Sequence, residues 1–356
     1  MGIKIGLRKR LALELFAREY KELTQKHDLK VLFWECTLRC NLNCRHCGSD
    51  CRAIADTPDM PAEHFLRAVD TITPHVNPRE VLIAITGGEA LLRPDLEEVG
   101  TELRKRGYRW GIVTNGMGLD RKRLERLTKA GLSSITISID GFADTHNAMR
   151  RNPLSFDRAV NALRAIIATP RLNYDVVTCV TPENFADLAK FKEFLIAEGC
   201  AAWRIFTVFP AGRAHNDQSL QLSNAQYQEL MEFIASTRKE GKIRLSYACE
   251  GFLGGYEAEV RDNFFGCMAG IGIAGIRIDG SISGCTSIRA NFDQGNIYND
   301  NLWEVWNNRF EKYRNREWCR KGACAECSVW RYCHGNGMHL YDEDECLMHC
   351  NYNRLK

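Results

Sequence analysis

Five cysteines gather between residues 36 and 51, in the stretch ECTLRCNLNCRHCGSDC. Three of them, Cys40, Cys44 and Cys47, have the spacing C-x3-C-x2-C. Three thiolates on one short loop can surround a metal centre, although a structural zinc ion or a four-iron cluster normally takes four. Cys36 and Cys51 could supply a fourth thiolate. From spacing alone, an iron–sulfur cluster, a zinc site and a disulfide framework all remain open.

A second group of thiols lies near the end of the chain. Eight thiolates equal two complete sets of four, which fits two iron–sulfur clusters or two zinc ions. The cysteines beyond residue 265 are Cys267, Cys285, Cys319, Cys324, Cys327, Cys333, Cys346 and Cys350. His334 and His339 lie among them and could bind iron, but histidines in such positions more often pack or lie at the surface.

The composition indicates where these thiols would function. Glu14, Arg18 and Glu19 interrupt the apolar core that a signal peptide needs, and no window is long enough for a transmembrane helix. We therefore expect a cytoplasmic protein, in which clustered thiols bind metal more often than they form disulfides. The net charge of only +3 gives no reason to expect a nucleic-acid partner.

The elements that must position the first thiols form a repeating pattern. Short apolar runs rich in Val, Ile and Thr alternate with amphipathic helices from residue 31 to about residue 210. The runs cover 31–37, 80–88, 108–116, 134–141, 174–182 and 202–210. Six β–α units predict an α/β fold with a parallel sheet, either an open barrel or a doubly wound sheet, and are too few for an eight-stranded barrel.

Polar residues end several of these predicted strands. The carboxyl ends of parallel strands meet at one edge of the sheet, where functional loops lie, and the first cysteine loop leaves the same edge. Glycines there allow close approach to the backbone, and carboxylate and hydroxyl groups suit an ammonium group and ribose. The residues are Gly87, Gly88, Glu89, Thr114, Asn115, Ser138 and Asp140. Together they predict a site for a nucleoside that carries an amino acid.

The rest of the chain divides into three further segments. Residues 1–30 predict an amphipathic helix that packs on the body of the protein. Its apolar residues are Leu7, Leu11, Leu15, Phe16, Tyr20 and Leu23. After the core at 31–241 come a bridging segment at 242–262 and a Cys-rich domain at 263–356, which opens with a hairpin around Asp279 and Gly280.

The cysteine motif, followed by GGE at 87–89 and S-x-D at 138–140, resembles the radical S-adenosylmethionine (radical SAM) enzymes over about residues 30–215. The resemblance implies a partial (β/α)6 TIM-like barrel. It also implies a [4Fe-4S] cluster held by Cys40, Cys44 and Cys47, whose open iron binds S-adenosylmethionine. The GGE residues would contact the methionine moiety and the S-x-D residues would lie near the ribose. Cys36 and Cys51 would then be bystanders.

The C-terminal pattern C-x12-G-x4-C, followed by CAECSVWRYC, resembles a SPASM domain, which usually carries two auxiliary [4Fe-4S] clusters. The resemblance assigns Cys267 and Cys285 to one cluster. It assigns Cys324, Cys327 and Cys333 to the other cluster. The family pattern expects one more cysteine where this chain has Gly337, and the roles of Cys319, Cys346 and Cys350 stay open.

The same resemblance implies a function. Reductive cleavage of S-adenosylmethionine would form a 5′-deoxyadenosyl radical, fed by a one-electron reductant such as a flavodoxin or ferredoxin. The resemblance favours a peptide or protein substrate, in which the enzyme installs a crosslink, thioether or epimerised centre. His146, Arg150 and Arg204 are the pocket candidates. The alternatives are the same chemistry on a small molecule such as a sugar, and a non-catalytic zinc or cluster scaffold.

Overall fold

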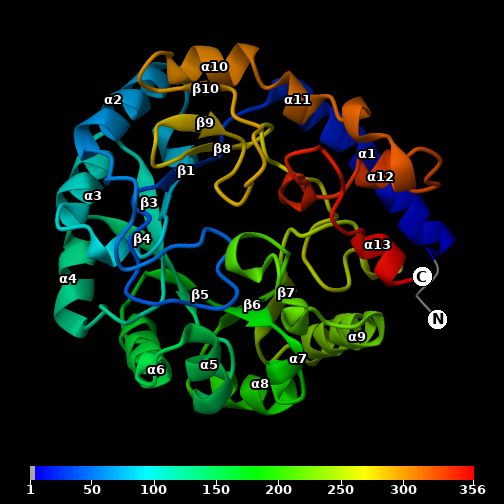
Figure 1. Cartoon of the computed structure of the whole chain (residues 1–356), viewed down its shortest axis with the longest axis horizontal. Helices are drawn as coiled ribbons and strands as arrows, with labels where there is room; N and C mark the ends of the chain where they lie inside the picture. Colours follow the sequence, from blue (N-terminus) through cyan, green and yellow to red (C-terminus); the bar gives the residue numbers. More distant parts are fainter. Residues whose placement is uncertain (1–4) are drawn as a thin grey trace.

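The computed structural model describes residues 5–356. Within this range, ten strands form one sheet in the order β10-β9-β8-β1-β2-β3-β4-β5-β6-β7. The strands from β1 to β7 are parallel neighbours in chain order (Figure 1). They are β1 (Val31–Glu35), β2 (Leu82–Thr86), β3 (Arg109–Thr114), β4 (Leu132–Ser138), β5 (Asn173–Val180), β6 (Ala202–Thr207) and β7 (Arg244–Tyr247).

The six predicted strands and the α/β class are confirmed, but β7 was not predicted. It lies in the segment that we interpreted as a bridge. Its four residues alternate between the polar Arg244 and Ser246 and the apolar Leu245 and Tyr247, so they do not form an apolar run. Only its pairing with β6 makes it part of the sheet.

Helices cover the outer face of the sheet (Figure 1). They are α2 (Ala62–Ile72), α3 (Leu96–Lys105), α4 (Arg121–Lys129), α5 (Ala143–Arg150), α6 (Ser155–Ile167), α7 (Pro182–Phe185), α8 (Leu188–Ala197) and α9 (Asn224–Glu240). On β6, Trp203 packs edge-on against Phe191 of α8 and Phe233 of α9. Because successive strand residues point to opposite faces, Arg204 and Phe206 face the interior of the barrel.

The C-terminal strands extend this sheet. β8 (Ile273–Ile276) pairs in parallel with β1, and β9 (Ser281–Ser283) pairs antiparallel with both β8 and β10 (Gly295–Asn296). The predicted hairpin is confirmed, and Gly280 at its turn has a φ of 85° that favours glycine. Among the described residues, the edge strands β7 and β10 do not pair with each other, so the barrel is partial.

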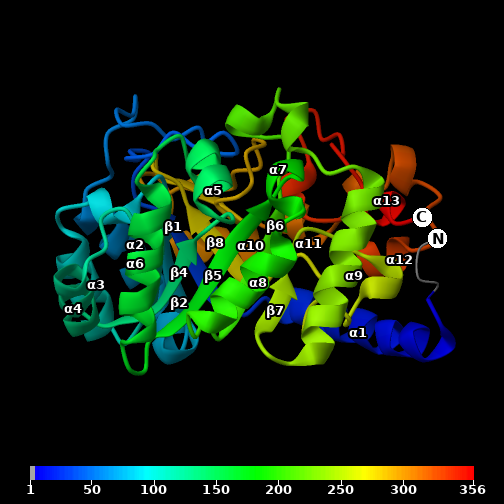
Figure 2. The same cartoon turned by 90° about the horizontal axis from the view of Figure 1, so that it is seen from below.

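The first helix, α1 (Leu7–Lys26), lies along the C-terminal domain beside α12 (Trp330–Cys333) (Figures 1 and 2). Leu13 is buried in a cluster with Phe252 and Phe265. The Tyr20 hydroxyl donates to the Cys267 carbonyl at 2.8 Å. The predicted helix is therefore confirmed and packs on the body of the protein, although residues 1–4 lie outside the described part.

The predicted apolar face of α1 is wrong in its first half. Leu7, Leu11 and Leu15 are 76%, 59% and 66% exposed, whereas Leu13 is 1% exposed. The helix is rotated so that Leu13 and Tyr20 are buried, because Phe252 of the bridging segment and Phe265 of the C-terminal domain pack on Leu13, and the Cys267 carbonyl accepts from Tyr20. The periodicity of the sequence predicts a line of apolar side chains along one face of the helix. Which face is buried depends on the surface against which the helix packs.

The C-terminal domain contains short helices joined by loops. They are α10 (Leu302–Asn308), α11 (Glu311–Arg314), α12 and α13 (Asn351–Arg354). A 3-10 turn, η9 (Met338–Leu340), follows α12. No helix in residues 5–356 is long and apolar enough to cross a membrane.

Candidate functional site

The loop after β1 gathers the first thiols. The Cys40 N–H donates to the Arg52 carbonyl at 2.7 Å, which ties the two ends of the loop together. Cys40, Cys44 and Cys51 are buried in one small cluster, with Cys47 packed against it. The structure thus brings the three predicted thiols together in one loop.

The two remaining cysteines of this stretch behave differently. Cys36 is fully buried in the main core. Cys51 instead lies beside Cys47, and its hydrogen bond is the largest of the effects that lower the pKa of Cys47 to about 5. Cys51 is therefore a neighbour of the first thiol group, whereas Cys36 packs away from it.

Gly87 and Gly88 bring the second strand against the cysteine loop. A Cβ atom at Gly87 would lie 2.2 Å from the Thr37 carbonyl oxygen, and one at Gly88 would lie 2.1 Å from the Arg39 carbonyl oxygen. The Gly88 N–H donates to Thr37 and the Glu89 N–H donates to Arg39, at 2.7 and 2.9 Å. Both glycines are thus required by backbone contact within the protein, in addition to any space they leave for a ligand.

Glu89 joins this loop to the end of β3. One carboxylate oxygen accepts hydrogen bonds from the Thr114 hydroxyl at 2.8 Å and the Leu91 N–H at 3.2 Å. The other accepts the Asn115 N–H at 2.8 Å. The Asn115 amide nitrogen lies 3.8 Å from the sulfur of Cys40. A carboxylate has about four acceptor positions, so Glu89 can still accept a hydrogen bond from an ammonium group.

Asp140 is fully buried, and protein donors occupy both of its carboxylate oxygens. Arg150 Nε donates to one oxygen at 2.6 Å, and the Cys179 N–H donates to the other at 2.9 Å. Burial alone would raise the pKa of Asp140, but the charge and hydrogen bond of Arg150, together with the nearby His46 and His146, hold the pKa well below its ordinary value. Asp140 thus fixes the position of Arg150, and the ribose contacts of Ser138 and Asp140 stay predictions.

His146, one of the three pocket candidates, has protein partners at both ring nitrogens. Its Nδ1 accepts the Asp140 N–H at 2.9 Å, and its Nε2 donates to the Ser155 hydroxyl at 2.8 Å. The side chain is fully buried, and burial lowers its pKa to about 4. Because both ring nitrogens have protein partners, His146 supports the loop that carries Asp140.

Arg150 and Arg204, the other two candidates, lie where a ligand could reach them. Arg150 Nη1 is 3.8 Å from the sulfur of Cys44. Arg204, on the inner face of β6, forms an ion pair with Asp175 at 2.8 Å and is 38% exposed in its side chain. Its Nε has no hydrogen-bond partner among the described residues. Arg204 therefore has a partly exposed side chain at the inner face of the barrel, although its Nε atom is buried.

His46 was not among the predicted residues, although it lies directly before Cys47. Its Nε2 is 4.0 Å from a carboxylate oxygen of Asp140, and its buried Nδ1 has no partner in the described part of the chain. A buried polar atom without a partner normally binds a water or a ligand. Its position between two cysteines of the motif is the sequence signal that could have identified it.

Arg213 was also not predicted. Its Nε donates to the Cys44 carbonyl at 2.7 Å, and its Nη1 donates to Asp50 and to the Cys51 carbonyl. Gly212 allows this contact, because a Cβ there would lie 2.5 Å from the Cys47 carbonyl oxygen. The loop after β6 thus clamps the cysteine loop from the opposite side of the barrel.

A cavity of about 480 Å³ opens beside this loop. Its lining combines one thiol of the motif with amides and three guanidinium groups. The lining residues are Cys40, Asn41, Leu42, Asn43, Arg52, Ala53, Arg151 and Arg213. The cavity gives a polar, positively charged route to the first thiols.

The C-terminal thiols form two groups. The first auxiliary group consists of Cys267, Cys285 and a cysteine that we did not predict, Cys249, which follows β7. Cys249 retains solvent-accessible surface, yet surrounding protein and then the nearby Cys285 and Cys267 raise its pKa to about 11. It lies two residues after β7, which the local pattern did not predict, so the sequence offered no local signal for Cys249.

The second auxiliary group surrounds Asn336, which is 1% exposed. The Asn336 N–H donates to the Cys333 sulfur at 3.2 Å, and its side-chain amide lies 3.6 Å from the Cys350 sulfur. Cys324 and Cys327 lie close enough to raise the pKa of Cys333, after burial and together with Cys350. We define this group as Cys324, Cys327, Cys333 and Cys350.

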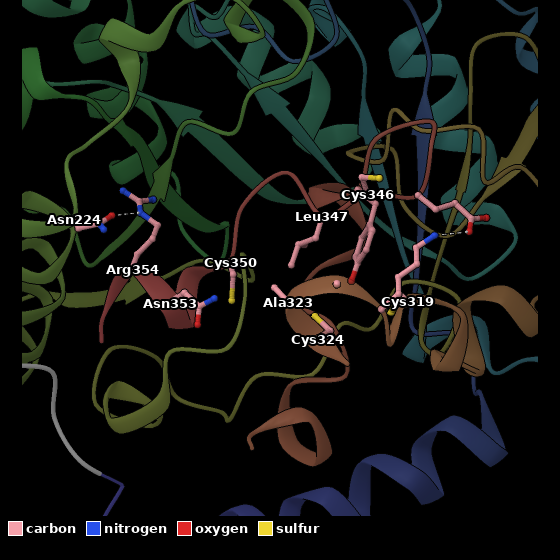
Figure 3. A pocket seen from close by; sticks show the side chains of 13 residues that line it. Asn224, Cys319, Ala323, Cys324, Cys346, Leu347, Cys350, Asn353 and Arg354 are labelled. Carbon is pink, nitrogen blue, oxygen red and sulfur yellow. Dashed lines mark hydrogen bonds and ion pairs between the residues drawn. The ribbon is translucent and has the colours of Figure 1, made fainter. Parts of the chain in front are cut away.

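A cavity of about 640 Å³ adjoins the second auxiliary group (Figure 3). Cys324 and Cys350 lie on two sides of it, and Cys346 lies at its far edge. Cys346 is exposed, whereas Cys319 is buried and its thiol donates to the Arg316 carbonyl at 3.0 Å. Cys319 nevertheless lies close enough to raise the pKa of Cys324, after burial and Cys350, so the ligand roles of Cys319 and Cys346 stay predictions.

The donor sets fit iron–sulfur clusters by their chemistry. Thiolates on apolar, half-buried loops are the usual ligands of such clusters. Among residues 5–356, no three His, Cys, Asp or Glu side chains converge closely enough to bind a single metal ion. The fit therefore rests on the thiol groups and on the unpartnered His46 nitrogen beside them.

Comparison with known protein families agrees with this geometry. The radical SAM superfamily matches residues 34–195, and the SPASM iron–sulfur cluster-binding domain matches residues 267–328. The chain carries a radical SAM domain and a SPASM domain. The first match contains the cysteine loop after β1, and the second contains Cys267, Cys285, Cys319, Cys324 and Cys327.

The relatives of this radical SAM chain correct the predicted substrate class. An AdoMet-dependent heme synthase of Methanosarcina barkeri is 28% identical over 356 residues, covering 89% of this chain and 96% of the relative. The Fe-coproporphyrin III synthase of the same organism is 25% identical over 340 residues and covers 87% and 84%. These names describe small-molecule products, so the predicted peptide maturase is wrong.

A solved structure supports the fold alone. Streptococcus suis SuiB bound to S-adenosylmethionine superposes with a TM-score of 0.69 at 17% identity, over 90% of this chain and 76% of SuiB. At this identity, the similarity extends to the arrangement of the barrel and the C-terminal domain. It carries no information about the substrate.

Proposed function

We propose that this radical SAM protein acts on an iron tetrapyrrole of the heme or coproporphyrin type. The observation that carries the proposal is the nearly full-length similarity to the M. barkeri heme synthase, which spans both domains. S-adenosylmethionine bound at the first thiol group would supply a carbon radical that removes a hydrogen atom from the substrate. The chain's own residues would bind and orient S-adenosylmethionine and the substrate, and would exclude water from the site.

The first thiol group would hold the cluster through Cys40, Cys44 and Cys47. Asn115 and Arg150 each place a nitrogen 3.8 Å from one of these sulfurs, where they would offset negative charge. Glu89, with an acceptor position left, would receive the ammonium group of the cofactor. Ser138 and the unpartnered His46 nitrogen would also face the bound S-adenosylmethionine.

The two auxiliary groups would hold two further [4Fe-4S] clusters, giving three in total. The second group has four thiols around Asn336, which is a complete ligand set. The first has three thiols. Reduction would come from a one-electron donor such as a flavodoxin or ferredoxin, and an auxiliary cluster would accept or relay the electron left after oxidation of the substrate.

The inner face of the barrel suits a flat aromatic ring with carboxylate side chains. Val113, 38% exposed, and Phe206 offer apolar surface there. The guanidinium of Arg204, whose side chain is 38% exposed, lies over the Phe206 ring, and guanidinium groups bind carboxylates through two donors. Arg204 is therefore the residue that we propose to bind a substrate carboxylate.

Iron binding tests the cofactor half of the proposal. After anaerobic reconstitution, about twelve iron atoms are expected per chain, and replacing Cys40, Cys44 and Cys47 with Ala should remove about four. Cys51→Ala is the matched control, because this buried thiol lies in the same loop but outside the motif. A loss of four irons in the control, or stoichiometric zinc in the wild type, contradicts the assignment.

Substrate turnover tests the other half. The reduced enzyme is incubated with S-adenosylmethionine and Fe-coproporphyrin III, and 5′-deoxyadenosine and the mass of the porphyrin are followed. We expect porphyrin-dependent 5′-deoxyadenosine, and weaker porphyrin binding in Arg204→Gln by about tenfold, which corresponds to about 1.4 kcal/mol. Cofactor cleavage that no iron porphyrin stimulates would exclude this substrate class.

A further inference from the structure

His339 occupies the space beside the first auxiliary group where a side chain at position 337 would lie. A Cβ atom at Gly337 would be 2.6 Å from Cε1 and 2.8 Å from Nδ1 of the His339 ring. The next residue, Met338, donates its N–H to the Cys267 sulfur at 3.5 Å. The imidazole and a thiol of the first auxiliary group therefore border the same short turn.

The same turn also contacts the segment that carries Cys249. The Glu250 carbonyl oxygen would lie 3.5 Å from a Cβ atom at Gly337. The His339 ring and two of the three thiol-bearing segments thus meet around one residue.

Neighbouring side chains hold the orientation of the ring. Phe209 packs edge-on against His339, with ring centroids 5.1 Å apart. The Phe209 ring also approaches Gly48 in the first cysteine loop, where a Cβ atom would lie 3.4 Å away. Phe209 therefore contacts both the imidazole and the first cysteine loop.

The ring has the chemistry of a metal ligand. His339 forms no hydrogen bond to another side chain or backbone group among residues 5–356 that would occupy a ring nitrogen. A neutral imidazole has a free lone pair on one ring nitrogen, which is the form that binds iron.

We propose that His339 completes the first auxiliary group by binding one iron atom of the cluster held by Cys249, Cys267 and Cys285. This inference rests on the auxiliary clusters proposed above. Three thiolates leave one iron of a four-iron cluster without a protein ligand, and the His339 ring borders the turn whose N–H contacts the Cys267 sulfur. A neutral imidazole in place of a thiolate makes the cluster less negative and raises its reduction potential.

The experiment reads the ligand directly and does not depend on turnover. The full-length chain with Cys40, Cys44 and Cys47 replaced by Ala keeps only the auxiliary groups. It is reconstituted with iron and sulfide, reduced, and examined by pulsed EPR after growth with natural or ¹⁵N-labelled histidine. We expect a nitrogen coupling on one reduced cluster that changes with the isotope.

Variants then assign the nitrogen to one residue. His339→Ala should lose the coupling, and His339→Cys should lose it while retaining about eight irons and showing a lower potential. His334→Asn is the matched control: His334 stacks on Tyr20 at 5.5 Å, its φ of 48° suits asparagine, and the variant should keep the coupling.

The possible results distinguish the role of His339 from the proposed function of the protein. About eight bound irons without any histidine coupling in the wild-type auxiliary groups would overturn the role of His339 and leave the proposed function intact. Persistence of the coupling in His339→Ala would do the same. Failure of the auxiliary groups to bind iron would overturn both. The isotope comparison needs no His339 variant, so it remains decisive if those variants do not fold.

Discussion

Arg289 donates from Nη1 to the buried carboxylate of Glu35 at 2.9 Å, and so joins the end of β1 to the loop after the auxiliary hairpin. Its other terminal nitrogen donates to the Ser49 hydroxyl and, at 2.8 Å, to the Thr286 carbonyl. Ser49 lies two residues after Cys47, and Thr286 directly follows Cys285. One guanidinium therefore links the first cysteine loop to the first auxiliary group.

Arg289→Gln should destabilise the protein by about 2 kcal/mol, because the carboxylate of Glu35 would lose a charged partner while remaining buried. Urea unfolding measures the loss. Glu35→Gln combined with Arg289→Gln should cost less than the sum of the single changes. Arg320→Gln, which removes an exposed pair with Glu317, is the control, with an expected loss below about 0.5 kcal/mol. Equal losses in the two arginine variants would show that the buried link contributes nothing special.

Asp140→Asn should destabilise the protein at neutral pH by about 3 kcal/mol, since it leaves Arg150 buried beside Cys44 without its counter-ion. The pKa of Asp140 is held below its unfolded value, so its contribution is present above about pH 4 and is lost as the pH falls further. Asp175→Asn removes the more exposed pair with Arg204 and should cost about 1 kcal/mol or less. If thermal unfolding ranks the two variants in the opposite order, the assigned role of Asp140 is wrong.

The buried His146 should make stability pH-dependent. Its pKa of about 4 lies below the unfolded value of about 6.5, so the unfolded chain binds the proton first and stability falls as the pH drops from about 6.5 towards 4. One such group adds a slope of up to about 1.4 kcal/mol per pH unit. His146→Gln should show a correspondingly smaller slope in urea unfolding between about pH 7 and pH 5. Parallel slopes for the variant and the wild type would contradict this.

Gly212→Ala should loosen the clamp on the cysteine loop. The added methyl group would lie 2.5 Å from the carbonyl oxygens of Cys47 and Gly48, at a φ of 56°. Gly241→Ala is a matched control, because its φ is 70° but nothing lies within 4 Å. We expect a loss of about 1 kcal/mol for Gly241→Ala from backbone strain alone, and about 3 kcal/mol with reduced iron retention for Gly212→Ala. Equal losses would mean that the close approach is unimportant.

Local pattern was enough for the strands and for the thiols of the motif. The parallel strands from β1 to β6 are apolar runs that are buried by helices, so their composition reports their position directly. Cys40, Cys44 and Cys47 lie within one short loop, and covalent spacing alone keeps them near each other. The hairpin around Gly280 was likewise predictable, because a tight turn depends on a few adjacent residues.

Contacts between distant segments could not be read in this way. The pairing of β7 with β6 brings Cys249 towards Cys267 and Cys285, and the clamp by Arg213 depends on the relative positions of two loops across the barrel. Asp140 and His146 had suitable side chains for a pocket, but the turn into α5 directs them towards Arg150 and Ser155. A side chain's chemistry does not reveal whether its partner is a ligand or the protein itself.

The sequence by itself therefore determined the sheet, the kind of metal chemistry and the three thiols of the first group. These depend on hydrophobic periodicity and on residues close together along the chain. Only the tertiary structure decided which face of α1 is buried, which C-terminal thiols share a group, and that His339 fills the position left by Gly337. Those features depend on strand register and on packing between segments far apart in sequence, which no local spacing encodes.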